Sequence, residues 1–137
     1  MQPSNSDPRT QPWWRVRIAS FGYALKGIKV LISTQPHARF HLFASLVVCG
    51  LGMYLSLSIV SWSLVILSMG IVWAAEAFNS AIEFLVDLVH PEWHEKAGRI
   101  KDLAAGAVLL VSLAVALVGL LVFGSRLIEL GHLPWLG

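Results

Sequence analysis

The sequence predicts an all-α membrane protein, in which an amphipathic helix at the membrane interface precedes three membrane-spanning helices. Of its 137 residues, 56% are hydrophobic and only 13% are charged, and the mean hydropathy is +0.69. A single soluble domain of this length cannot bury that much apolar surface. The apolar runs are long and lack the alternation of barrel strands, so helices are the expected spanning elements.

The first helix is expected at residues 13–34, after a polar tail at 1–12 that contains three prolines and is predicted to be disordered. Apolar residues recur at alternating spacings of four and three: Trp14, Ile18, Phe21, Leu25, Ile28 and Ile32. Basic residues point away from this apolar seam. Such a helix suits the interface beside anionic head groups, and packing onto the polar ends of the spans is an equally ordinary role.

Three spans follow Pro36, which disfavours helical geometry in the residue before it. Each run supplies the roughly 20 apolar residues that cross a bilayer. The predicted spans are about 38–58, 62–89 and 96–124, within a single domain at 13–125 that is followed by a C-terminal tail at 126–137.

The distribution of cations predicts the orientation. Nine of the ten Lys and Arg residues lie at or before the start of the first span, or around the turn between the second and third. Because cytoplasmic loops carry an excess of cations, the N-terminus and that turn are expected on the cytoplasmic side of the membrane. A net charge of +2 is too small to indicate a nucleic-acid partner.

An acidic stripe interrupts the second span. Glu76, Asn79, Glu83 and Asp87 share one helix face, whereas residues 40–75 contain no charge. A carboxylate at membrane depth costs roughly 3 kcal/mol on insertion scales, and such residues usually mark a site of function. The stripe is therefore the candidate site.

Oxygen ligands and a nearby cation indicate phosphate chemistry. Glu76, Asn79, Glu83 and Asp102 suit Mg²⁺, which takes one or two carboxylates together with phosphate oxygens, and Lys101 can neutralise phosphate charge. A structural polar network is one alternative. An ion pathway is another, but it needs polar groups across the full membrane depth, which the other halves of the spans lack.

The turn after the stripe offers two lesser candidates. His90 and His94 are spaced like a zinc pair, but Pro91 lies between them and no third ligand is evident, so polar anchoring is the simpler role. Asp87 is expected either to act in catalysis or to pair with Lys96 or Arg99.

The stretch EAFNSAIEFLVDLVHPEWHEKAGRIKDLAAGAVL, together with FGYALKGIK upstream, resembles the signature of the prokaryotic diacylglycerol kinase family, which includes undecaprenol kinases. The resemblance implies a homotrimeric membrane enzyme with active sites shared between subunits. It also implies transfer of the γ-phosphoryl group of Mg-ATP to a lipid hydroxyl, either of diacylglycerol or of undecaprenol.

The resemblance implies roles for individual residues. Glu76 and Glu83 match the essential carboxylates, one for metal and one as base, in an order that spacing leaves open. The positions implied for catalysis, nucleotide binding or metal binding also include Asn79, Lys101, Asp102, Tyr23, Lys26 and Gln35. Gln35 departs from the family pattern, because a metal-ligating glutamate usually stands there, and an amide binds Mg²⁺ less well than a carboxylate.

Overall fold

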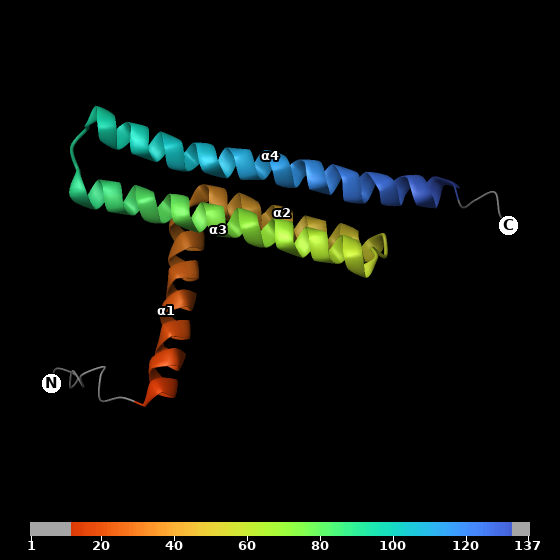
Figure 1. Cartoon of the computed structure of the whole chain (residues 1–137), viewed down its shortest axis with the longest axis horizontal. Coiled ribbons are helices and arrows are strands. Elements are labelled where there is room, and N and C mark those ends of the chain that lie inside the picture. The colour runs from red at the N-terminus through yellow and green to blue at the C-terminus, as the bar shows by residue number, and fades with distance from the viewer. Residues whose placement is uncertain (1–11, 133–137) are drawn as a thin grey trace.

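The computed structural model describes residues 12–132, in which all regular structure is helical (Figure 1). Helix α1 spans Trp13–Thr34, α2 spans Pro36–Tyr54, α3 spans Ile59–Val89 and α4 spans Glu95–His132. The all-α class is confirmed. The predicted tail at 1–12 lies outside the described residues, apart from Pro12.

Helices α2, α3 and α4 run side by side, and α1 extends away from them at a steep angle (Figure 1). Helix α3 lies between the two turns and packs against both of its neighbours in sequence. Short turns make α3 antiparallel to both α2 and α4, and the α1–α2 corner lies beside the middle of α3 (Figure 1).

Two helices, α3 and α4, are long and apolar enough to cross a membrane. With 31 residues, α3 rises about 46 Å at 1.5 Å per residue, more than the roughly 30 Å of a bilayer core. Helix α2 has 19 residues and begins at Pro36. The sequence predicts that α2 is the first of three membrane spans, and this stays a prediction.

Arg39 holds the corner between α1 and α2, where Gln35 is the single connecting residue. Its guanidinium donates to the carbonyl oxygens of Ile32, at 3.0 Å, and Ser33, at 2.5 Å. These carbonyls lie at the C-terminus of α1, where helical hydrogen bonds run out and a cation is favoured. The corner thus fixes where α2 begins.

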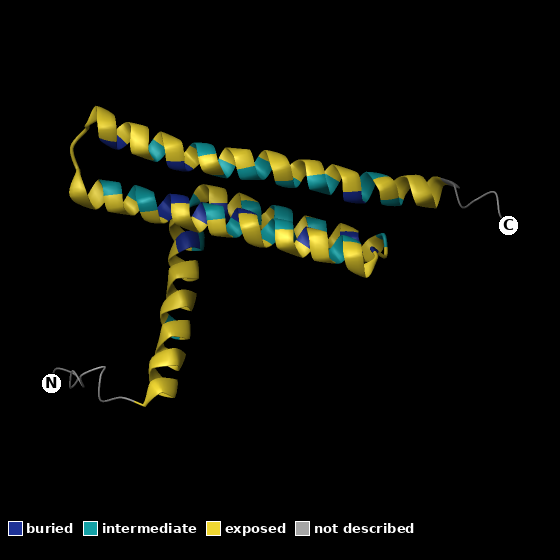
Figure 2. Ribbon diagram, viewed as in Figure 1, coloured by how far each residue is buried: buried dark blue, intermediate teal, exposed yellow. Residues whose placement is uncertain are grey.

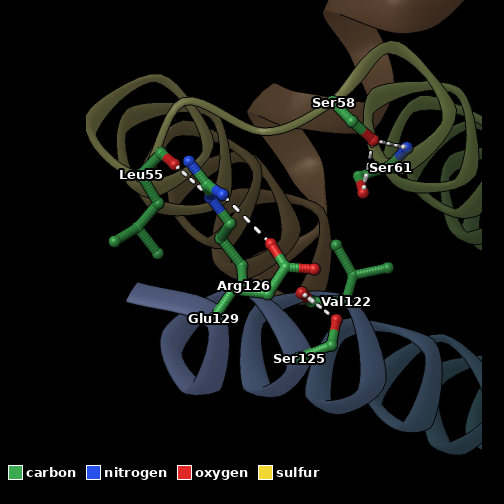
Figure 3. Close-up of polar contacts among 7 residues, drawn as sticks. All are labelled: Leu55, Ser58, Ser61, Val122, Ser125, Arg126 and Glu129. Carbon is green, nitrogen blue, oxygen red and sulfur yellow. Dashed lines mark hydrogen bonds and ion pairs between the residues drawn. The ribbon is translucent and has the colours of Figure 1, made fainter. Parts of the chain in front are cut away.

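A second arginine holds the opposite end of α2. The turn after α2 contains Ser56, with φ of 51°, and ends at Ser58, which caps α3 by accepting from the backbone N–H of Ser61. Arg126 of α4 donates to the carbonyl oxygen of Leu55 at 2.8 Å and pairs with Glu129 at 3.0 Å (Figure 3).

The Arg126 contacts lie in a region assigned by sequence to a tail. Helix α4 continues through that region to His132. Residues 126–132 are more polar than the span, and Arg126 among them contacts a carbonyl 71 residues earlier in the sequence. A local hydropathy pattern cannot predict such a contact.

The buried core is small. Leu57, Val65 and Val122 form it beside the α2–α3 turn, and most other apolar side chains along the helices are exposed (Figure 2). The apolar seam of α1 is also largely uncovered, with Phe21 73% exposed. A single chain therefore leaves most of its apolar surface for lipid or for another subunit.

Close packing at the α2–α3 turn gives the first testable prediction. A Cβ added to Gly52 would lie 2.8 Å from Cη2 of Trp62 and 3.2 Å from Cδ1 of Leu57. Gly52→Ala is therefore expected to destabilise the protein by about 1–3 kcal/mol, the usual cost of overpacking. The matched control is Gly50→Ala on the same helix, because no atom lies within 4 Å of that position. Equal melting temperatures of the two detergent-solubilised variants would contradict the packing seen here.

Candidate active site

The acidic stripe of α3 changes steadily in burial along its length. Glu76 is only 2% exposed and Asn79 is 7% exposed, whereas Glu83 is half-buried and Asp87 is exposed. The stripe thus leads from the protein interior toward the turn between α3 and α4. A carboxylate buried as deeply as Glu76 is costly unless it has a partner or a function.

Hydrogen bonds within the stripe leave an acceptor free. The Nδ2 group of Asn79 donates to Oε1 of Glu83 at 3.1 Å, and the Ser80 hydroxyl donates to the backbone carbonyl of Glu76 at 2.9 Å. The Oδ1 atom of Asn79 is buried and has no partner in the described part of the chain. Leaving such an atom unpaired costs about 1–3 kcal/mol, which favours a bound donor or cation at this point.

A hollow of about 360 Å³, which we term the Glu76 hollow, opens beside these side chains. Three helices line it: α2 through His37, Phe40 and His41, α3 through Glu76, Asn79 and Glu83, and α4 through Ala105, Val108, Leu109 and Ser112. Carboxylates and an amide form one wall, and mainly apolar side chains form the α4 wall. The hollow therefore suits a molecule with a polar end and an apolar body.

His37 and His41 are site residues that the sequence interpretation missed. They are four residues apart in the first turns of α2, so they share a helix face, and both line the Glu76 hollow. The available signal was a pair of imidazoles at the start of a predicted span. Sequence spacing alone does not show that these imidazoles lie beside the carboxylates of α3, because that contact depends on how α2 packs against α3.

Lys101 pairs with Asp87, not with Glu83. Its Nζ lies 2.5 Å from Oδ1 of Asp87. The expectation that Asp87 pairs with Lys96 or Arg99 was wrong, because Arg99 instead pairs with Glu95 on its own helix. The antiparallel turn brings Lys101, well inside α4, back beside the end of α3.

A second hollow, of about 320 Å³, lies at this turn, and we term it the turn hollow. Asp87 and Lys101 line it together with His90, Trp93 and His94. The imidazoles of His90 and His94 stack with centroids 5.2 Å apart. Residues 12–132 hold no cluster of three or more His, Cys, Asp or Glu side chains that could by themselves bind a metal.

Four other candidates lie apart from the Glu76 hollow in this chain. Asp102 lines a separate groove with Leu103 and Gly106 on α4. Tyr23 and Lys26 are exposed on α1, where the lysine Nζ lies 5.6 Å from the tyrosine ring centroid. Gln35 is half-buried at the corner between α1 and α2. One chain thus brings together Glu76, Asn79 and Glu83, and separately Asp87 and Lys101.

The grouped oxygens fit Mg²⁺. Glu76 and Glu83 supply carboxylates on one helix face, and the free Oδ1 of Asn79 lies between them along the helix. Mg²⁺ is usually held by one or two carboxylates plus substrate phosphates, without an all-protein cage. Three oxygen-bearing side chains that leave coordination positions for phosphate fit this mode of Mg²⁺ binding.

Comparison with known proteins identifies similar sequences. The family model described as prokaryotic diacylglycerol kinase matches residues 22–123. Undecaprenol kinase of Bacillus subtilis strain 168 is 36% identical over 108 residues, which cover 79% of this chain and 88% of that protein. Diacylglycerol kinase of Synechocystis is 34% identical, covering 86% of this chain and 70% of the relative. Diacylglycerol kinase of Escherichia coli K12 is 33% identical, covering 74% and 82% respectively.

Proposed function

Since the chain belongs to the prokaryotic diacylglycerol kinase family and is a lipid kinase, we propose that it transfers the γ-phosphoryl group of ATP to a membrane lipid hydroxyl. The reaction takes place at the cytoplasmic face of a bacterial membrane, where the cation-rich α3–α4 turn is expected. The observation that carries this proposal is the buried carboxylate of Glu76, which lines a hollow whose α4 wall is mainly apolar.

The Glu76 hollow receives the acceptor lipid. An acyl or isoprenoid chain can lie against Val108 and Leu109 of α4 while its hydroxyl reaches the α3 wall. A hydroxyl there can donate to a carboxylate, or to the free Oδ1 of Asn79. Holding the reacting hydroxyl in one orientation supplies much of the catalysis in phosphoryl transfer.

The turn hollow receives the nucleotide. Lys101 presents a cation to phosphate, and Trp93, 89% exposed, with the stacked imidazoles of His90 and His94 offers flat surfaces for a base. Glu83 lies along α3 between this hollow and Glu76. The γ-phosphate of a nucleotide bound here therefore points along the stripe toward the acceptor.

The carboxylates of Glu76 and Glu83 have different roles, according to how deeply each is buried along α3. Glu83, nearer the nucleotide, would hold Mg²⁺ with Oδ1 of Asn79, and Glu76 is a further candidate ligand in the same hollow. Gln35, half-buried at the corner between α1 and α2, is a candidate ligand that the family resemblance alone implies. When bound, Mg²⁺ neutralises charge on the phosphate oxygens. Glu76, deepest and nearest the lipid chain, accepts the proton of the lipid hydroxyl. The lipid oxygen bonds to the γ-phosphorus as the bond to the β–γ bridging oxygen breaks, which yields a lipid phosphate and ADP.

A homotrimer completes the site. Tyr23, Lys26 and Asp102 lie apart from the Glu76 hollow within one chain, although the family resemblance implies that they act near the nucleotide. The uncovered apolar seam of α1 supports docking of this helix against a neighbouring subunit. Sites shared between subunits would bring these residues to the nucleotide.

Lys101 tests where the nucleotide binds. Lys101→Met is expected to raise KM for ATP at least about tenfold, because a charge-assisted contact with phosphate is worth roughly 1.5–3 kcal/mol. Its melting temperature should hardly change, since a solvent-exposed ion pair contributes only about 0–1 kcal/mol. Lys29→Met, at an exposed position on α1, is the control and should leave both quantities unchanged. An unaltered KM for ATP would place the phosphates elsewhere.

The acceptor lipid is tested directly with purified protein, Mg²⁺ and γ-labelled ATP. Diacylglycerol and undecaprenol are offered separately, because relatives of both names are similar to this chain. Label is expected in the lipid phosphate of at least one of them, and none is expected when the hydroxyl is replaced by a methyl ether. Labelling of neither lipid above a control without lipid would refute the proposed function.

A further inference from the structure

We propose that His41 is a catalytic residue that donates a hydrogen bond to the phosphoryl group as it reaches the lipid oxygen in the Glu76 hollow. His37, one turn earlier, lines the same wall. This inference rests on the proposed function and adds to it a group on α2. It assigns to α2 a part in the chemistry that the acidic stripe of α3 cannot supply.

The α3 wall of the hollow presents mainly acceptors. Glu76 and Glu83 present carboxylates, the Oδ1 of Asn79 is a free acceptor, and one of the two N–H groups of Asn79 Nδ2 already donates to Glu83. The incoming phosphoryl group carries negative charge on its equatorial oxygens. Mg²⁺ held at this wall would neutralise part of that charge, and a donor on another wall of the hollow can stabilise the oxygens that the metal does not reach.

The residues on the other walls include few side chains that could donate a hydrogen bond to the phosphoryl group. None of the described residues that line the Glu76 hollow is Lys or Arg. Lys101 lies at the turn hollow, where the proposed function places it beside the nucleotide, and Arg39 donates to carbonyls of α1. Apart from the hydroxyl of Ser112 and the second N–H of the Asn79 amide, the imidazoles of α2 are the remaining side-chain donors among the described residues that line the hollow. An imidazole carries at least one N–H whether neutral or charged.

Contacts around His41 hold it in place against α3. Its backbone carbonyl accepts from the Ser45 hydroxyl at 2.7 Å, and that hydroxyl accepts from Nε1 of Trp73 at 3.2 Å. Trp73 lies one turn before Glu76, so this chain of bonds ties α2 to α3 close to the buried carboxylate. The ring of Phe40 packs edge-on to the imidazole, with centroids 5.9 Å apart. These bonds fix the backbone of α2 at His41 beside the site, and a donor positioned in advance stabilises developing charge without reorganisation.

His41 is partly buried and His37 is exposed, which is why the proposal centres on His41. The ordinary alternative is that His41 only anchors α2 at the membrane interface. An anchor needs a polar ring of suitable size, whereas a catalytic donor needs an N–H facing the phosphoryl group. Substitution by glutamine or by leucine distinguishes the two roles, because glutamine keeps an N–H donor and leucine does not.

The experiment compares His41→Leu, which removes the donor, with His41→Gln, which keeps an N–H donor without an imidazole. Loss of a donor to a developing charge typically costs about 10²–10³ in rate where it is fully engaged, so a fall in kcat of at least about tenfold is expected for leucine. Glutamine should restore most of that loss. KM for ATP should stay within about twofold in both, since the nucleotide binds at the turn hollow. Phe43→Leu, on an exposed part of α2, is the control and should keep full activity.

Three results overturn the proposal. They are an unchanged kcat in His41→Leu, an equal loss in the leucine and glutamine variants, and a loss explained entirely by a lower melting temperature of both. Should His41→Leu fail to accumulate in the membrane, His41→Ala replaces it in the same comparison. A wild-type protein that phosphorylates no lipid refutes the proposed function itself, whereas an active wild type with an active His41→Leu refutes only this inference.

Discussion

Burial of the Glu76 carboxylate in an apolar helix is the constraint on which the rest of the structure depends. Placing it at membrane depth costs roughly 3 kcal/mol, a large fraction of the stability of a small domain. The surrounding polar atoms do not offset the cost fully, because Oδ1 of Asn79 is left unpaired beside it. In the proposed function, a lipid hydroxyl, a metal–nucleotide complex or both bind to the polar atoms of the stripe during the reaction. This binding would account for burying them without protein partners.

The remaining polar contacts position the other helices against the acidic stripe of α3. Arg39 binds the last carbonyls of α1, and Arg126 binds the carbonyl of Leu55 at the end of α2, so each terminus of α2 is fixed by a guanidinium. Trp73 and Ser45 add a polar contact at the level of the site. These contacts set the position of His37 and His41 against the carboxylates of α3. The short loops and the arginines thus determine the shape of the Glu76 hollow.

Local patterns predicted much of this arrangement. Hydropathy and helical periodicity gave the all-α class, the helix at 13–34 and the acidic face of α3, because these depend on neighbours in sequence. Pairings across turns could not be predicted: Asp87 selects Lys101, and Arg126 extends α4 through a contact with Leu55. The histidines of α2 were missed for the same reason, since only packing shows that they face Glu76. Tyr23, Lys26 and Asp102 lie apart from the Glu76 hollow within one chain, and the proposal that they act at the site depends on the proposed homotrimer.

Glu76→Gln tests most directly whether the buried carboxylate is kept for chemistry at the expense of stability. The rate of lipid phosphorylation and the melting temperature are measured on the same detergent-solubilised preparation. We expect the rate to fall at least about 100-fold, because an amide cannot take the proton of the hydroxyl. We also expect the melting temperature to hold or rise, because removing the charge lowers an insertion cost of roughly 3 kcal/mol. A variant that melts at a lower temperature but whose folded fraction phosphorylates lipid at the wild-type rate would show that Glu76 is a structural group.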